Sequence, residues 1–151
     1  MRPQENRSGY ISEEQRRILV KNKRLLMEKG FERGARHFRT TYDAYDANTI
    51  ELMREYFELS FVGMGSATGT NLRVTDPSTI GFKGADDYAK ARRLIDTAVE
   101  YNQLLGMNFH MRHMPSEEAF TDLVEYVRDY ERRDQLAVIT PSILLDEYLG
   151  G

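Results

Sequence analysis

Apolar side chains recur at helical spacing through the first third of the chain. Ser12 and Gln15 form a capping box, which predicts a helix start with acidic residues in its first turn. Two apolar sets follow on helical faces, first Ile18, Leu19, Leu25 and Leu26 and then Phe31, Ala35, Phe38 and Tyr42. Glycine in a helix interior is destabilising, and Gly30 and Gly34 weaken the middle of this stretch. The pattern therefore predicts that residues 13–41 form one long helix, or two helices with a break near Gly30.

A second and a third amphipathic helix are predicted further along the chain. The second begins near Asp46 or Asn48, because Asn48 and Glu51 form a cap pair. Its apolar face consists of Ile50, Met53, Phe57 and Phe61. The third runs from about Asp86 to Leu105, and one face of it consists of Tyr88, Ala91, Ile95, Ala98, Asn102 and Leu105. Gly106 is a natural stop for that helix.

The last third of the chain predicts two further helices. Pro115 can occupy the first turn of a fourth helix, whose buried face consists of Phe120, Leu123, Val124, Val127 and Tyr130. Residues 136–139 are strand-like or extended, and Thr140 and Pro141 open a short final helix. The predicted fold is therefore all-α, with three main helices in an up-down bundle. The predicted regions are an N-terminal arm at 1–12, the bundle at 13–105 and a C-terminal helical extension at 106–151.

Length and composition favour one globular domain. The chain has 151 residues, of which 40% are hydrophobic and 30% are charged, a balance that suits a folded core with a solvated surface. The absence of cysteine excludes disulfides, thiolate metal sites and a thiol nucleophile. No apolar run approaches the roughly 18 residues that a membrane helix requires, so no direct membrane span is expected.

Charge is distributed unevenly along the chain, although the net charge is only −3. Residues 1–41 contain eleven Lys and Arg against five Asp and Glu, whereas residues 115–151 contain three against nine. The two ends either face each other or are simply solvated, or the basic front binds an acidic partner. The sequence pI of about 5.7 argues against nucleic acid as that partner. An acidic protein surface suits the cations of the first helix, Arg16, Arg17, Lys21, Lys23 and Arg24.

Three features suggest chemistry, and each lacks a necessary part. Residues 63–71 are rich in glycine, but the stretch has no lysine and follows a predicted helix rather than a strand, so it is interpreted as a flexible connection. His110 and His113 are spaced to share a metal on one helical face, yet a structural zinc site needs four ligands, and a methionine-rich helix end is the alternative. The three histidines do not allow a Ser/His/Asp set to be assembled. The chain is therefore expected to be non-catalytic, with no metal or cofactor of its own.

Three short motifs follow one another along the chain. Glu-Gln-Arg-Arg-Ile at 14–18 opens the basic helix, Met-Arg-Glu-Tyr-Phe at 53–57 lies in the second helix, and Val-Thr-Asp-Pro at 74–77 precedes the third, which carries Ala91-Arg92-Arg93-Leu94. Together they resemble the LYR-motif family of small mitochondrial three-helix proteins over about residues 13–105, with the closest likeness to LYR accessory subunits on the matrix arm of complex I. The Leu-Tyr-Arg triplet itself is absent, residues 61–73 look like an insertion, and residues 106–151 lie outside the common core.

The resemblance implies a specific function. Family members bind mitochondrial acyl carrier protein, whose acidic surface would meet Arg16, Arg17, Lys21, Lys23 and Arg24. The acyl chain on the carrier's phosphopantetheine would enter a channel lined by Leu25, Met53, Phe57 and Ile95, whose other role is ordinary core. The chain would then be a non-catalytic accessory or assembly subunit of a complex I-like respiratory complex, on the matrix side of the mitochondrial inner membrane.

Two other functions remain open. A structural interaction protein of an unrelated assembly, for example a virion component, would show the same charge polarity and oligomerise without a carrier. An enzyme with a small-ligand or metal site around His110 and His113 would instead show metal-dependent stability.

Overall fold

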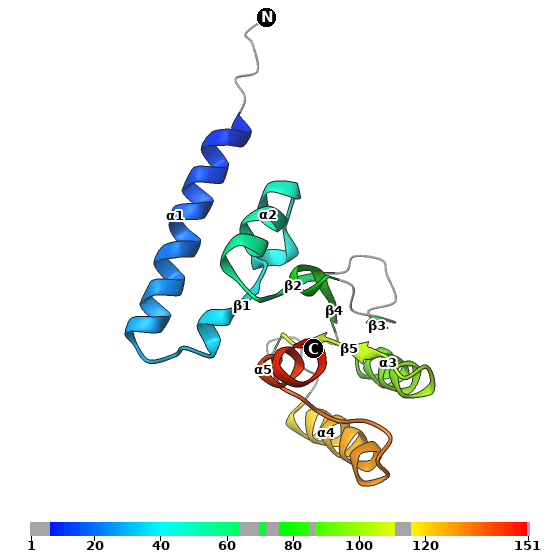
Figure 1. The fold of residues 1–151 in the computed structure, drawn as a ribbon. Coiled ribbons are helices and arrows are strands. Elements are labelled where there is room, and N and C mark those ends of the chain that lie inside the picture. The colour runs from blue at the N-terminus through cyan, green and yellow to red at the C-terminus, as the bar shows by residue number, and fades with distance from the viewer. Residues whose placement is uncertain (1–6, 64–69, 72–75, 85–86, 111–115, 151) are drawn as a thin grey trace, which may run out of the picture.

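A parallel β-sheet lies at the centre of the computed structural model, which describes residues 7–63, 70–71, 76–84, 87–110 and 116–150 (Figure 1). Its four strands have the order β1-β2-β4-β6, and β3 pairs with β5 in a separate antiparallel ladder. The fold is therefore mixed α/β, and the all-α prediction is wrong. The three-helix up-down bundle predicted for residues 13–105 is not formed, because the strands of this sheet separate its helices in sequence and in space.

The strands are short. β1 is His37–Arg39, β2 is Leu59–Gly63, β4 is Ile80–Gly84 and β6 is Met107–Asn108, while the small ladder consists of β3 (Thr70–Asn71) and β5 (Leu104–Leu105). The helices are α1 (Arg7–Glu28), α2 (Ala47–Tyr56), α3 (Tyr88–Glu100), α4 (Glu117–Arg132) and α5 (Pro141–Ile143), and α5 continues as a π-helix, Leu144–Leu149. Single 3-10 turns occupy Gly34–Arg36, Thr41–Asp43 and Pro77–Thr79.

Most helices begin at or near the residues that the sequence predicts. The side chains of Asp46, Asp87, Ser116 and Thr140 each accept a hydrogen bond from the backbone N–H three residues later, which satisfies a donor of the first turn. α1 differs, because it begins at Arg7 and Ser12 lies within it. Pro115, predicted in the first turn of α4, lies outside the described residues.

The helices α1 and α3 end at residues with positive φ. Gly30 (φ 79°) ends α1 in a Schellman motif, with Phe31 N–H donating to the Leu26 carbonyl at 2.9 Å. The predicted break near Gly30 is therefore confirmed, but the helix predicted after it is wrong, because Gly34–Arg36 is a single 3-10 turn and His37–Arg39 is a strand. Asn102 (φ 50°) ends α3 in the same way, so the prediction that Gly106 stops this helix is wrong. The chain instead continues from Asn102 into β5 and β6.

The core is divided into three apolar clusters around the sheet. One joins α1 and α2 and contains Leu19, Leu52 and Phe57. The second contains Leu59, Ile80 and Leu144, and seals one face of the sheet under the C-terminal helix. The third joins α3 and α4 and contains Ala91, Ile95 and Leu123. In space, α1 lies beside α2 at one end of the molecule, and α3, α4 and α5 gather at the other end (Figure 1).

An ionic contact attaches the C-terminal helix to the sheet. Arg36 precedes β1, and its guanidinium donates to both carboxylate oxygens of Glu58, at 3.1 and 3.0 Å, and to Asp146, at 2.8 Å. His37 Nε2 lies 3.0 Å from Ser142 Oγ and joins α5 to β1. The hydrogen bonds from Arg36 lower the pKa of the carboxyl groups of both Glu58 and Asp146.

Docking of the C-terminal helix is expected to weaken in acid. Because the folded pKa values are lowered, this ionic contribution is complete above the unfolded values of 4.5 and 3.8 and is lost as the pH falls through the folded ones. NMR spectra recorded from about pH 6 to about pH 3 should therefore show the amide signals of residues 142–149 shifting below about pH 4. Arg36→Met should loosen the segment already at the higher pH and flatten this profile. An unchanged profile in Arg36→Met would show that Arg36 is not the cause.

Candidate interaction surface

The inner side of α1 is attached to α2 by two cations. Arg16 donates to the Glu55 carboxylate, with Nη1 at 2.5 and 2.6 Å from its two oxygens, and to the Tyr56 hydroxyl at 2.6 Å. Lys23 Nζ donates to the Tyr56 carbonyl at 2.5 Å and lies 5.6 Å from the centre of the Phe57 ring. The hydrogen bond from Arg16 lowers the pKa of Glu55, which keeps that carboxylate charged. Arg16 and Lys23, both predicted partner contacts, therefore hold α1 in place.

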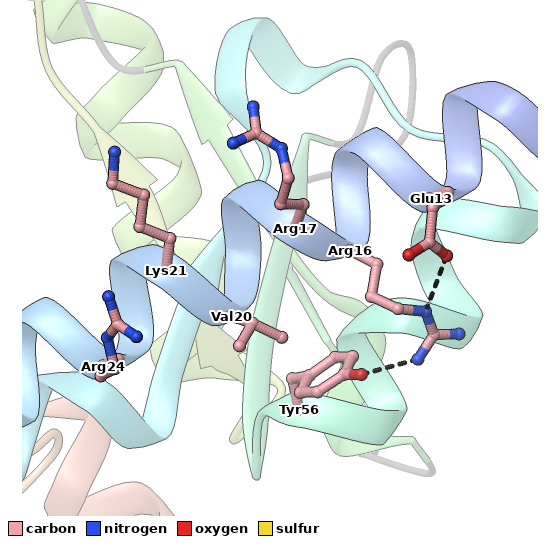
Figure 2. Close-up of a pocket in the computed structure, with 7 residues that line it drawn as sticks. All are labelled: Glu13, Arg16, Arg17, Val20, Lys21, Arg24 and Tyr56. Atoms are coloured by element: carbon pink, nitrogen blue, oxygen red, sulfur yellow. Dashed lines mark hydrogen bonds and ion pairs between the residues drawn. The ribbon is translucent and has the colours of Figure 1, made fainter.

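The outer side of α1 presents the other three predicted cations. Arg17 pairs with Glu14 at 2.7 Å and Arg24 with Glu28 at 3.3 Å, while Lys21 makes no ion pair with the residues that the structure describes. Figure 2 shows Arg17 and Lys21 projecting away from Tyr56, whereas Arg16 extends toward it. Exposed pairs within one helix contribute only about 0–1 kcal/mol, so carboxylates of a partner can replace Glu14 and Glu28 at little cost.

A shallow hollow runs beside α1, from these outer cations to the contact with α2. It is lined by Glu13, Arg16, Arg17, Val20, Lys21, Arg24 and Tyr56 (Figure 2). Apolar side chains lie close to these cations, since Ile18, Val20, Leu25 and Met27 are each 40–48% exposed. Cations mixed with exposed apolar side chains on a fixed helix are typical of a protein–protein contact surface.

The four predicted acyl-chain residues fall in different places. Met53 and Phe57 are buried at 0% and 7% exposure, the latter in the cluster between α1 and α2. Leu25 lies on α1 and is 40% exposed. Ile95 belongs to the separate cluster of α3 and α4. The structure therefore does not bring Ile95 together with the other three.

His110 lies in an extended segment after β6 rather than on a helix, and His113 lies outside the described residues. Within the described ranges, no group of three or more His, Cys, Asp or Glu side chains could hold a metal ion. His110 instead lines a second hollow with Arg39, Thr40, Thr41 and Tyr42. The four residues from Arg39 to Tyr42 were not predicted as part of a site, because the sequence pattern assigned them to the end of a helix. Recognising His37–Arg39 as a strand would have indicated that they lie at a strand end.

The glycine-rich stretch follows a strand, not a helix. Gly63 is the last residue of β2, so the predicted order of elements at this point is wrong. Residues 64–69 lie outside the described part of the chain, as do Val74 and Thr75 of the motif at 74–77. Asp76 is described, and it caps the 3-10 turn Pro77–Thr79 by accepting a hydrogen bond from the Ser78 N–H at 2.9 Å.

Neither the helices of the structure nor comparisons with known proteins assign this chain to a protein family. Across the described ranges, no helix has the length and apolar character needed to cross a membrane. Comparisons with protein-family models, with curated proteins and with solved structures found no match. The interpretation of the surface therefore depends on its geometry and charge.

Proposed function

We propose that this chain is a non-catalytic interaction protein that presents the outer face of α1 to an acidic protein. The observation that carries the proposal is that two of five neighbouring cations hold α1 on α2, and the other three lie at the surface. Arg16 and Lys23 anchor the helix to α2, whereas Arg17 and Arg24 form ion pairs within α1 and, with Lys21, line an exposed hollow beside that contact. The backbone that carries these three charges is fixed in advance, so no helix has to be ordered on binding, and the charges steer an acidic partner into register.

The first partner to test is an acyl carrier protein. The resemblance to the LYR-motif family names it, together with a complex I-like assembly on the matrix side of the mitochondrial inner membrane, and a carrier has the acidic surface that the array would bind. Ile95 lies in a different cluster from Phe57. We therefore propose that α1 binds the acidic surface of the carrier, and not that a channel takes up its acyl chain.

The test is a charge reversal with a matched control. Lys21→Glu with Arg24→Glu should weaken binding of purified acyl carrier protein at least about tenfold, because each lost pair and each new repulsion contributes up to about 1 kcal/mol. Lys90→Glu with Arg93→Glu has the same spacing and charge change on the exposed side of α3, and should leave the affinity within about twofold. Isothermal titration calorimetry gives the affinities, and circular dichroism checks the helix content.

Self-association is the second outcome that the charge distribution favours. α4 carries six carboxylates against two arginines, so it could receive α1 of another copy, as in a structural assembly protein. Light scattering would then show oligomers of the wild type that the α1 reversal dissociates. If the chain neither binds the carrier nor self-associates through α1, the proposed function is wrong.

A further inference from the structure

One flank of α1 carries an apolar seam that is open to solvent. Ile18 and Leu25 lie one heptad apart and are 46% and 40% exposed, and Leu26 beside them is 36% exposed. Asn22 and Lys29 continue the seam, four and eleven residues after Ile18, and both are exposed. Residues at this spacing share one face of a helix, as they do along the contact line of a coiled coil. We call these five residues the α1 seam.

The α1 seam and the basic hollow lie on different flanks of the helix. The inner face is marked by Leu19, which is 7% exposed and belongs to the cluster with α2. An α-helix turns by about 100° per residue, so Ile18 lies to one side of Leu19 and Val20 lies to the other. Val20 lines the hollow, whereas no residue of the seam does. Because α1 lies along the edge of the molecule (Figure 1), the seam stays open when an acidic protein occupies the hollow.

The order of side chains in the seam suits an antiparallel copy of the same helix. When two such helices cross an axis near Asn22, Ile18 of each copy faces Leu25 of the other. Each Asn22 then faces its own counterpart, and two amides so placed can exchange hydrogen bonds, because each has a carbonyl acceptor and an NH₂ donor. A single asparagine in an otherwise apolar seam fixes the register of paired helices.

The charges at the ends of the seam also match in this arrangement. Glu14 and Lys29 lie at nearly equal distances along the chain before and after Asn22, so each ammonium comes beside a carboxylate of the other copy. Such pairs at a rim contribute at most about 1 kcal/mol, but they select the orientation. A parallel arrangement would bring Lys29 beside Lys29 and Glu14 beside Glu14. An acidic protein has less to gain here than in the hollow, because the seam carries only one cation.

We propose that two copies of this chain pair through the α1 seam, with their first helices antiparallel. The contact is closed, because each copy contributes the same residues. A few apolar side chains per copy bury less than the roughly 1,200 Å² of a stable interface, so we expect a weak dimer that dissociates at about 10 µM and forms at about 500 µM. This pairing is independent of the proposed binding of an acidic protein by the other flank.

Sedimentation equilibrium of the full chain across this concentration range tests the proposal. Ile18→Glu with Leu25→Glu places four carboxylates against one another in the paired seam, so this variant should remain monomeric at about 500 µM. Both side chains are already exposed in the monomer, and circular dichroism should show unchanged helix content.

Val20→Glu with Met27→Glu is the matched control. These residues have the same spacing on α1 and are 41% and 48% exposed, but they lie outside the seam. The control should therefore dimerise within about twofold of the wild type. Equal dissociation of the control and the seam variant would overturn the proposal, because it would show that the seam is not the contact.

Cysteine crosslinking tests the orientation, since the chain has no cysteine of its own. Under mild oxidation at high concentration, a mixture of Ile18→Cys and Leu25→Cys copies should give the mixed disulfide-linked dimer. Disulfide-linked homodimers of each variant would instead show parallel helices and overturn the proposed arrangement.

The charge reversal in the hollow separates this proposal from the proposed function. Lys21→Glu with Arg24→Glu should weaken carrier binding and leave the seam dimer intact. Dissociation of the dimer by this reversal alone would indicate pairing of α1 with α4 of another copy and would overturn the seam. A wild type that stays monomeric at about 500 µM, or a seam variant that dimerises as the wild type does, would also overturn it.

Discussion

Replacing Leu59 with alanine is expected to lower the free energy of unfolding by about 3 kcal/mol. Leu59 is 0% exposed and opens β2, where it pairs in register with His37 of β1. Its side chain packs against Ile80 and Leu144, so it joins the sheet to the C-terminal helix. Truncation leaves a cavity, because a sheet fixed on both sides cannot move in to fill it. The free-energy cost of the cavity adds to the cost of no longer burying the removed atoms.

Leu25→Ala is the matched control for Leu59→Ala. The same atoms are removed from a side chain on α1 that is 40% exposed, so the expected loss is about 0.5 kcal/mol. Urea unfolding followed by circular dichroism measures both values. Equal losses at the two positions would show that Leu59 is not packed in the cluster with Ile80 and Leu144. The Leu25 variant also tests whether this exposed side chain contributes to partner binding.

Helix positions could be predicted from the sequence because their signals are local. A cap such as Asp46 contacts the N–H of Thr49, three residues away, and the spacing of the two is visible in the chain. The break at Gly30 is likewise local, since glycine adopts a positive φ without strain. Asn102 adopts a similar conformation, but the sequence pattern placed it on a helix face, which is why the end of α3 was predicted too late.

The strands could not be predicted because each is too short to show its own period. β1 has three residues, and Phe38 within it falls at helical spacing from Phe31 and Ala35. Phe61 of β2 similarly extends the apolar face of α2. Short strands that are covered on both faces do not alternate between apolar and polar residues, so they match either pattern.

The candidate surface could be predicted only in part, for a similar reason. Local charge counts find the basic helix and the five cations predicted to bind a partner. They do not show which cations the fold itself uses, because Lys23 contacts Tyr56, 33 residues away, and Arg16 contacts Glu55, 39 residues away. Only the long-range packing of α1 on α2 separates anchoring cations from those left for a partner.

Gly106→Ala is expected to destabilise the fold by about 3 kcal/mol, for a reason unrelated to helix termination. A Cβ at this position would lie 2.9 Å from Phe82 Cβ and 3.1 Å from the Gly81 carbonyl oxygen, so the backbone of β4 would have to shift. Gly106 thus permits the close approach between β4 and the segment that joins β5 to β6. The displaced Phe82 ring also lies under the Arg39 guanidinium, whose carbon is 4.1 Å from the ring centre.

Gly84→Ala separates this steric effect from the general effect of replacing glycine. Gly84 lies on β4 too, but a Cβ there would meet no atom within 4 Å. The substitution should change the unfolding free energy by less than about 1 kcal/mol, and toward greater stability, because alanine restricts the unfolded chain. Urea unfolding of both variants distinguishes the two glycines. If Gly106→Ala were as stable as Gly84→Ala, the close packing of Gly106 against Phe82 would be refuted.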